Sequence, residues 1–163
     1  MTDYILATDK SWHIEYFVKH RNELPGNWLV VANLGDLRTI LEKETPKYIF
    51  FPHWSSKVDS QITSRFDCIC FHMTDLPFGR GGSPLQNLII RGHKKTKLTA
   101  LKMTDVIDGG PIYFKQEMSV EGPAHEIYSR TAKVCFDLIS KIISEQPKPK
   151  MQSGKETYFK RRR

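Results

Sequence analysis

Short apolar runs without polar alternation occur in the first half of the chain. Four such runs cover residues 4–8, 28–32, 48–52 and 67–72. Strands that are buried on both faces of a parallel sheet have this pattern, because helices cover both of their faces. Stretches of helical character at 12–21 and 35–44 lie between the runs, and Ser55 is suited to cap a third helix. This alternation predicts an α/β fold with a doubly wound, mostly parallel sheet and flanking helices.

The second half of the chain predicts two more helices and two extended segments. Pro84 suits the first turn of a helix that ends at Gly92. The extended segments 97–103 and 111–120 follow, with a glycine-containing turn between them. From 124 to 145, apolar residues recur on one broad helical face, so we expect a long helix that closes the sheet.

The charge of the chain is concentrated at its C-terminal end. The net charge is +7, and residues 148–163 carry seven basic side chains and one acid, which leaves +1 for residues 1–147. We therefore expect a catalytic domain at 1–147 and a basic, irregular segment at 148–163. RNA binding through Arg161, Arg162 and Arg163 is an alternative hypothesis. The near-neutral domain argues against it, so nucleic acid is not expected as a partner.

Other features of composition bound the compartment. The cysteines Cys68, Cys70 and Cys135 have no CxxC spacing, which favours a reducing environment. The N-terminus lacks the basic start and long apolar stretch of a signal peptide, and no apolar run approaches the ~20 residues of a membrane span. These features predict a cytoplasmic protein without a membrane partner, and they leave a homodimer open.

Two histidines follow neighbouring runs of the predicted sheet. In open α/β sheets, ligands bind outside the carboxyl ends of the strands. His53 and Trp54 follow the third run, although a rim histidine and a packed tryptophan explain them equally well. His72 ends the fourth run and enters a loop with Asp75, Arg80 and three glycines. A buried strand seldom leads into such a polar loop without a function, so His72 is the stronger candidate.

Three other patterns carry less information by themselves. The run Gly79–Ser83 matches neither common phosphate-binding motif. Cys68, Cys70 and His72 alternate on one strand face, but a fourth metal ligand at suitable spacing is lacking, so we expect buried cysteines and no metal. Asp108 precedes two glycines and a proline, which is an ordinary turn sequence. It becomes a candidate catalytic residue only if it pairs with His72.

A longer set of residues resembles a known family. The set comprises the run His72-Met73-Thr74-Asp75-Leu76-Pro77, then Gly81, Pro84, Gln86, Gly92, Thr96, Thr99, Met103, Asp108 and Gly110. It resembles the folate-dependent formyltransferase domain, which is shared by glycinamide ribonucleotide, methionyl-tRNA and sugar N-formyltransferases. The likeness covers residues 48–146 and implies a formyltransferase-like, Rossmann-type fold. It also implies transfer of a formyl group from 10-formyltetrahydrofolate to a primary amine.

The resemblance assigns roles to the reacting groups. His72 and Asp108 match the catalytic histidine and aspartate of the family, whereas Cys70 stands where the family has an asparagine that holds the formyl oxygen. A thiol is a much weaker hydrogen-bond donor than an amide. Either His53 or Thr74 therefore supplies the missing donor, or the protein is a slow enzyme or a binding protein without turnover.

The resemblance also implies where ligands bind. The folate pterin is expected between a loop with Pro52, His53, Trp54, Ser55 and Ser56 and a loop with Asp105, Val106 and Ile107. The acceptor is expected at Thr74, Arg80, Gly81 and Gly82. Three segments look more like the sugar enzymes than the other members, namely 51–58, 72–89 and 155–162. This likeness favours a nucleotide-linked amino sugar or a nonulosonic-acid precursor as the acceptor. A purine precursor and methionyl-tRNA are alternatives, and the second domain of the tRNA enzymes is not expected in 163 residues.

Overall fold

A six-stranded mixed sheet forms the centre of the molecule. The computed structural model describes residues 1–162, so Arg163 and its expected role in RNA binding lie outside the described residues. The strand order is β2-β1-β3-β4-β6-β7, in which the first four strands are parallel and β6 is antiparallel to both of its neighbours, β4 and β7. The strands are β1 (Tyr4–Ala7), β2 (Trp28–Val31), β3 (Tyr48–Phe51), β4 (Cys68–His72), β6 (Lys95–Lys102) and β7 (Ile112–Ser119). The predicted mostly parallel α/β sheet is confirmed.

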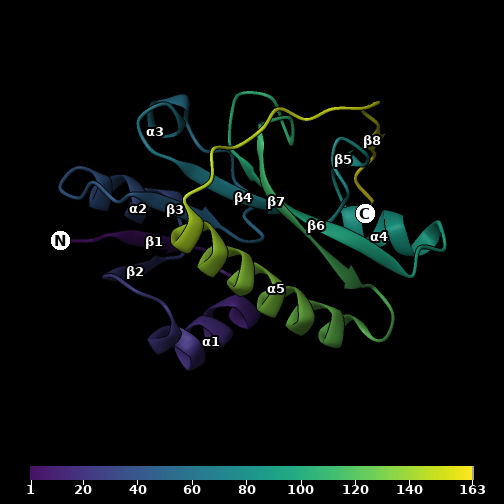
Figure 1. The fold of residues 1–163 in the computed structure, drawn as a ribbon, viewed down its shortest axis with the longest axis horizontal. Helices are drawn as coiled ribbons and strands as arrows, with labels where there is room; N and C mark the ends of the chain where they lie inside the picture. The colour runs from purple at the N-terminus through teal and green to yellow at the C-terminus, as the bar shows by residue number, and fades with distance from the viewer. Residues whose placement is uncertain (163) are drawn as a thin grey trace.

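Helices cover both faces of this sheet, which confirms the doubly wound arrangement. On one face lie α1 (Ser11–His20), followed by a 3-10 turn at Arg21–Glu23, and the long α5 (Ala124–Glu145) (Figure 1). On the other face lie α2 (Leu34–Leu41) and the short α3 (Ser60–Thr63). The side chain of Asn33 caps α2 by accepting from the backbone N–H of Asp36.

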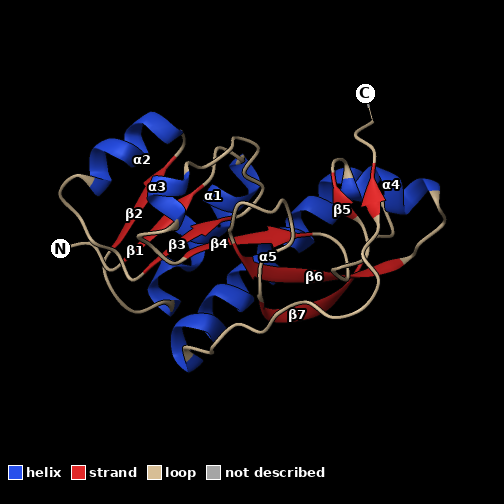
Figure 2. Cartoon of the chain, turned by 90° about the horizontal axis from the view of Figure 1, so that it is seen from above, coloured by secondary structure: helices blue, strands red, loops and turns tan. Residues whose placement is uncertain are grey.

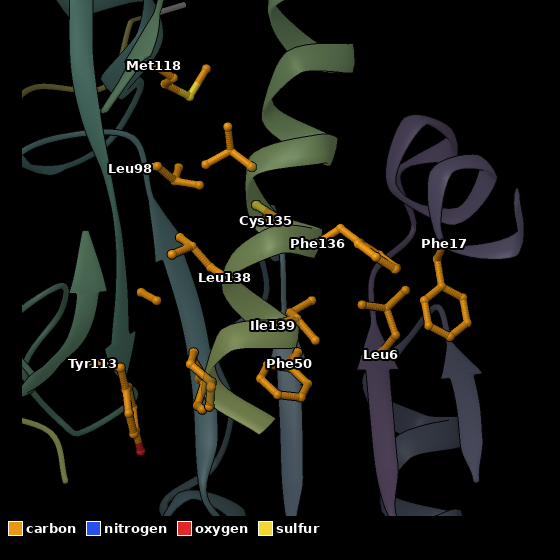
Figure 3. Packing of buried hydrophobic residues seen from close by; sticks show 14 of the residues in the cluster. Leu6, Phe17, Phe50, Leu98, Tyr113, Met118, Cys135, Phe136, Leu138 and Ile139 are labelled. Atoms are coloured by element: carbon orange, nitrogen blue, oxygen red, sulfur yellow. The ribbon is translucent and has the colours of Figure 1, made fainter. Parts of the chain in front are cut away.

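The larger apolar core lies between α5, α1 and the sheet. Leu138 and Ile139 of α5 point toward Leu98 and Phe50 of the strands, whereas Phe136 points toward α1 (Figure 3). Each fully buried side chain of this kind contributes about 1.5–3 kcal/mol to folding. This packing holds the carboxyl ends of β1, β3 and β4 in a fixed arrangement.

The third helix is shorter than the sequence predicts, and Ser55 does not cap it. Val58 is buried in the smaller core cluster, and Asp59 pairs with Arg38 at 2.7 Å. These two contacts hold residues 55–59 as a loop, so the helix begins at Ser60.

The C-terminal segment returns to the loop that follows β4. Arg80–Gly81 (β5) pairs in parallel with Tyr158–Phe159 (β8), beside α4 (Pro84–Ile90) at one end of the molecule (Figure 2). A single bridge also joins Ile112 to Lys150. The prediction of irregular structure after residue 147 missed both contacts, because such short pairings leave no periodic signal.

In the described residues 1–162, no helix is long and apolar enough to cross a membrane.

Candidate active site

His53 and His72 follow neighbouring parallel strands. Phe51, the last residue of β3, is paired with Cys70 of β4, and His53 and His72 come two residues later in the chain, His72 as the last residue of β4. His72 is 8% exposed, and its Nε2 lies 2.7 Å from the carbonyl oxygen of Gly79. A carbonyl oxygen only accepts, so Nε2 carries a proton and donates it. Nδ1 is thus the ring nitrogen left for other partners.

Asp108 lies beside that nitrogen. Its Oδ1 is 3.6 Å from Nδ1 of His72, which is an ion-pair distance and too long for a direct hydrogen bond. Its Oδ2 accepts from the backbone N–H of Gly81 at 2.9 Å. The structure therefore brings together the two residues that the sequence placed at the reacting centre, together with the glycine loop between them.

Asp108 does not follow the carboxyl end of a parallel strand, so the rule that ligands bind at these strand ends does not predict its place beside His72. Because β6 is antiparallel to β4, the turn after β6 starts at the amino end of β4, where the N–H of Met103 bonds to the Cys68 carbonyl at 2.8 Å. The turn then folds back along β4. Asp108 has a φ of +53°, and a Cβ on Gly110 would lie 1.8 Å from the Lys102 carbonyl oxygen. Glycine is thus required at position 110.

Cys70 lies below this turn as a neutral, half-buried thiol. Burial and the nearby carboxylate of Asp108 raise the pKa of the Cys70 thiol. Cys68 on the same strand is fully buried, and burial raises its pKa to about 12. Among residues 1–162, no group of three or more histidine, cysteine or acidic side chains has a metal-binding arrangement.

The residues expected to bind the acceptor are engaged in contacts within the protein. Thr74 is fully buried, and its hydroxyl donates to the Gly79 carbonyl at 3.2 Å. Arg80 is 7% exposed and binds the C-terminal segment. Its Nη1 donates to Glu156 and Tyr158, and its Nη2 donates to Gln152. Gly82 packs against Arg161, to which a Cβ would approach within 2.8 Å. Gly81 supplies the backbone N–H that Asp108 accepts.

The two loops expected to bind folate follow β3 and β6. Trp54 packs edge-on against Phe51 in the cluster that also contains Cys70 and Met103. The indole N–H of Trp54 is buried without a partner in the described chain. In the other loop, Val106 and Ile107 are 56% and 74% exposed. Pro52 is buried, whereas Ser55, Ser56 and Asp105 are exposed.

A second histidine pair lies where the strand order reverses, between β1 and β3. Nε2 of His13, in the first turn of α1, is 2.8 Å from Nδ1 of His53. Burial, followed by the effects of Lys10 and His72, lowers the pKa of His53 to about 4. Burial and His53 lower the pKa of His13 to about 3. Sequence reasoning missed His13. Ligands in open α/β sheets bind at the carboxyl ends of the strands where the strand order reverses, and His13 follows β1 at that point.

This pair predicts a pH dependence of stability. The folded protein keeps both rings neutral, whereas an unfolded chain protonates them below about pH 6.5. Stability is therefore lost as the pH falls, and the two rings together cost about 2–3 kcal/mol between about pH 7 and pH 5.5. We expect His13→Phe to halve the dependence of the unfolding free energy on pH in urea titrations. An unchanged dependence would contradict the assignment.

Comparison with known proteins finds methionyl-tRNA formyltransferases among both the sequence relatives and the solved structures. The chain is 29% identical over 127 residues to a methionyl-tRNA formyltransferase from Sulfurimonas denitrificans, covering 74% of this chain and 42% of the relative. A methionyl-tRNA formyltransferase structure from Clostridium thermocellum is 43% identical, with a TM-score of 0.91, and the match covers 100% of this chain and 74% of that one. No family model matches the chain.

A second, more distant structure shares the fold. HypX from Aquifex aeolicus, in complex with tetrahydrofolic acid, has a TM-score of 0.79 at 14% identity, covering 97% of this chain and 29% of that one. The chain spans 41–42% of the length of two curated relatives. Three observations point to the same family. They are the His72–Asp108 pair, the fold and the 43% identity to the Clostridium structure. The chain belongs to the folate-dependent formyltransferase family.

Proposed function

We propose that the chain transfers a formyl group from 10-formyltetrahydrofolate to a primary amine. The observation that carries this proposal is the His72–Asp108 pair at 3.6 Å, held by Gly79 on one side and Gly81 on the other. Family membership and the tetrahydrofolate complex of HypX support folate as the formyl carrier.

The chemistry of the pair fits this reaction. When a neutral amine attacks the formyl carbon, negative charge develops on the formyl oxygen and the amine must lose a proton. Nε2 of His72 is already bonded to Gly79, so Nδ1 is the nitrogen left for the formyl oxygen, and it donates to that oxygen when the ring is protonated. The carboxylate of Asp108 stabilises the positive charge that the ring carries when it is protonated. The proton lost by the amine moves to the folate nitrogen as that nitrogen leaves.

His53 is the donor that replaces the family's asparagine. Thr74 is excluded because its hydroxyl is fully buried and bonded to Gly79. If Nε2 of His13 donates to Nδ1 of His53, both rings adopt the tautomer that free imidazole side chains prefer, and Nε2 of His53 carries a proton. A neutral ring of low pKa is a poor base but a competent hydrogen-bond donor. His53 thus serves the formyl oxygen beside His72.

This role predicts unequal effects at two positions. His53→Ala removes the donor and should lower kcat about 10²-fold. Cys70→Asn restores the family's amide where a donor already acts, so its kcat should stay within about threefold of wild type. Steady-state release of tetrahydrofolate measures both rates. If Cys70→Asn raised kcat about 10²-fold while His53→Ala had no effect, the donor role of His53 would be wrong.

The loops that follow β3 and β6 offer contacts for the folate ring beside Trp54, Cys70 and Met103. The unpartnered indole N–H of Trp54 offers a hydrogen bond to a ligand, and the exposed Val106 and Ile107 offer apolar cover for a flat ring. These contacts support binding of the pterin by the loops that follow β3 and β6.

Methionyl-tRNA is the acceptor that the comparisons support better than an amino sugar. The Sulfurimonas relative and the Clostridium structure both carry that name. The excess of basic residues after position 147 suits a polyanion. This revises the sequence-based preference for an amino sugar and brings back the nucleic-acid partner that the near-neutral domain argued against. A nucleotide-linked amino sugar is the second candidate, favoured by the sequence of segments 51–58 and 72–89.

An acceptor panel tests the proposal. Purified protein and 10-formyltetrahydrofolate are mixed with methionyl-tRNA, nucleotide-linked amino sugars or glycinamide ribonucleotide, and release of tetrahydrofolate is followed. We expect release that depends on one of these acceptor classes. Calorimetric binding of the folate without release for any class would instead identify a binding protein without turnover and would overturn the enzymatic proposal.

A further inference from the structure

Residues 150–162, here called the C-terminal strap, cross both loops of the candidate active site. The strap starts at Lys150, which exchanges two backbone hydrogen bonds with Ile112 at 2.7 and 2.9 Å, directly after the turn that carries Asp108. It ends beside α4, where the side chain of Arg162 bonds to Asn87 at 2.9 Å. Between these two ends it runs past residues 79–82.

Gln152 of the strap is bonded to the Asp108 turn. Its Nε2 donates to the carbonyl oxygen of Asp108 at 2.8 Å and to that of Gly110 at 2.9 Å. Its Oε1 accepts from Nη2 of Arg80 at 2.8 Å. Only this orientation of the amide satisfies all three partners, because carbonyls accept and a guanidinium donates. Both N–H groups of the side chain are therefore used to hold the turn.

The same strap holds the loop that positions His72. Thr157 accepts from the N–H of Gly79 through its hydroxyl at 2.7 Å and from the N–H of Arg80 through its carbonyl at 2.9 Å. β8 then pairs with β5, so closely that a Cβ on Gly81 would lie 2.6 Å from the Phe159 carbonyl. Gly79 and Gly81 are the backbone partners of His72 and Asp108, respectively. One segment therefore fixes both halves of the site.

We propose that Gln152 is a positioning residue for formyl transfer, which acts by holding Asp108 at its distance from His72. The inference rests on the proposed function for its kinetic consequence, while the hydrogen bonds that carry it are independent of the reaction. Gln152 does not contact His72 and is not required to touch a substrate. Its effect passes through the backbone carbonyls of Asp108 and Gly110 and through Arg80.

Loss of the two donated bonds should displace the turn without unfolding the protein. In Gln152→Glu, carboxylate oxygens face the carbonyls of Asp108 and Gly110 and repel them, while the bond to Arg80 is kept. In Gln152→Met, both donors are lost without added charge. A misplacement of about 1 Å at a reacting centre can lower a rate on the order of 10²-fold.

The test compares Gln152→Glu and Gln152→Met with wild type and with Gln116→Glu. Gln116 is exposed on β7, so this control makes the same chemical change away from the site. We expect both Gln152 variants to lose about ten- to a hundredfold in kcat, with the KM values for folate and amine within about threefold of wild type. The amide of Gly81, which donates to Asp108, should exchange with solvent faster, while amides of α5 keep their protection. The control should match wild type in every measurement.

Two results would overturn the proposal. One is an unchanged kcat and unchanged exchange at Gly81 in both Gln152 variants. The other is a loss of activity that only follows a general loss of folded protein, seen as faster exchange throughout α5. If wild-type protein forms no formylated product with any acceptor, the proposed function fails. The exchange of the Gly81 amide then still decides whether Gln152 holds Asp108 in place.

Discussion

His72→Ala is expected to lower kcat for formyl transfer about 10³-fold, the largest effect of any single substitution in this protein. The change removes the ring whose Nδ1 faces the reacting centre and whose Nε2 is bonded to Gly79. The cost in stability should be small, about 1 kcal/mol, because Thr74 still donates to the Gly79 carbonyl. Stopped-flow or steady-state assays measure the rate, and thermal unfolding measures the stability.

The exposed His93 provides the matched control for this substitution. His93→Ala removes an imidazole of the same size from the surface and should leave kcat unchanged. Wild-type turnover in His72→Ala, with the melting temperature within about 4 °C of the parent protein, would remove His72 from the mechanism.

Asp108→Asn is expected to lower kcat about 10²-fold. Asparagine tolerates a positive φ as aspartate does, and its amide oxygen can still accept from Gly81, so the turn should keep its shape. What is lost is the negative charge 3.6 Å from Nδ1 of His72, which stabilises the ring when it is protonated. The assay is kcat measured at saturating folate and amine.

Asp137→Asn makes the same change on the exposed side of α5, where Asp137 pairs with Lys133, and should not affect the rate. An equal rate in Asp108→Asn and wild type would show that the charge of Asp108 has no role. A lower rate accompanied by faster exchange of the Gly81 amide would indicate a displaced turn instead of a lost charge.

The fold could be predicted well from local pattern. Continuous apolar runs located β1 to β4, and Pro84 and Gly92 marked the start and the end region of α4. These signals are local, because the types of adjacent residues determine both the burial of a strand on two faces and the ends of a helix. The late start of α3 was not predicted, since the buried Val58 and the Arg38–Asp59 pair depend on distant segments.

The site could be predicted only in part, for the same reason. The strand-end rule identified His72, but Asp108 follows an antiparallel strand and reaches His72 through a turn that folds back along β4. The family resemblance supplied that partner, and periodicity could not. Gln152 and the strap escaped prediction because their contacts join residues more than 40 positions apart and leave no repeating signal. Arg80, which the resemblance places at the substrate, is bonded to this strap in the structure.

The most direct measurement follows the formyl group itself. Protein is incubated with 10-formyltetrahydrofolate labelled in the formyl carbon and with each acceptor class, and the acceptor is then analysed by mass spectrometry. We expect the label on the amine of one acceptor with wild-type protein and on none with His72→Ala. Label that stays on the folate with every acceptor, or that moves equally well without His72, would contradict formyl transfer centred on His72 and Asp108.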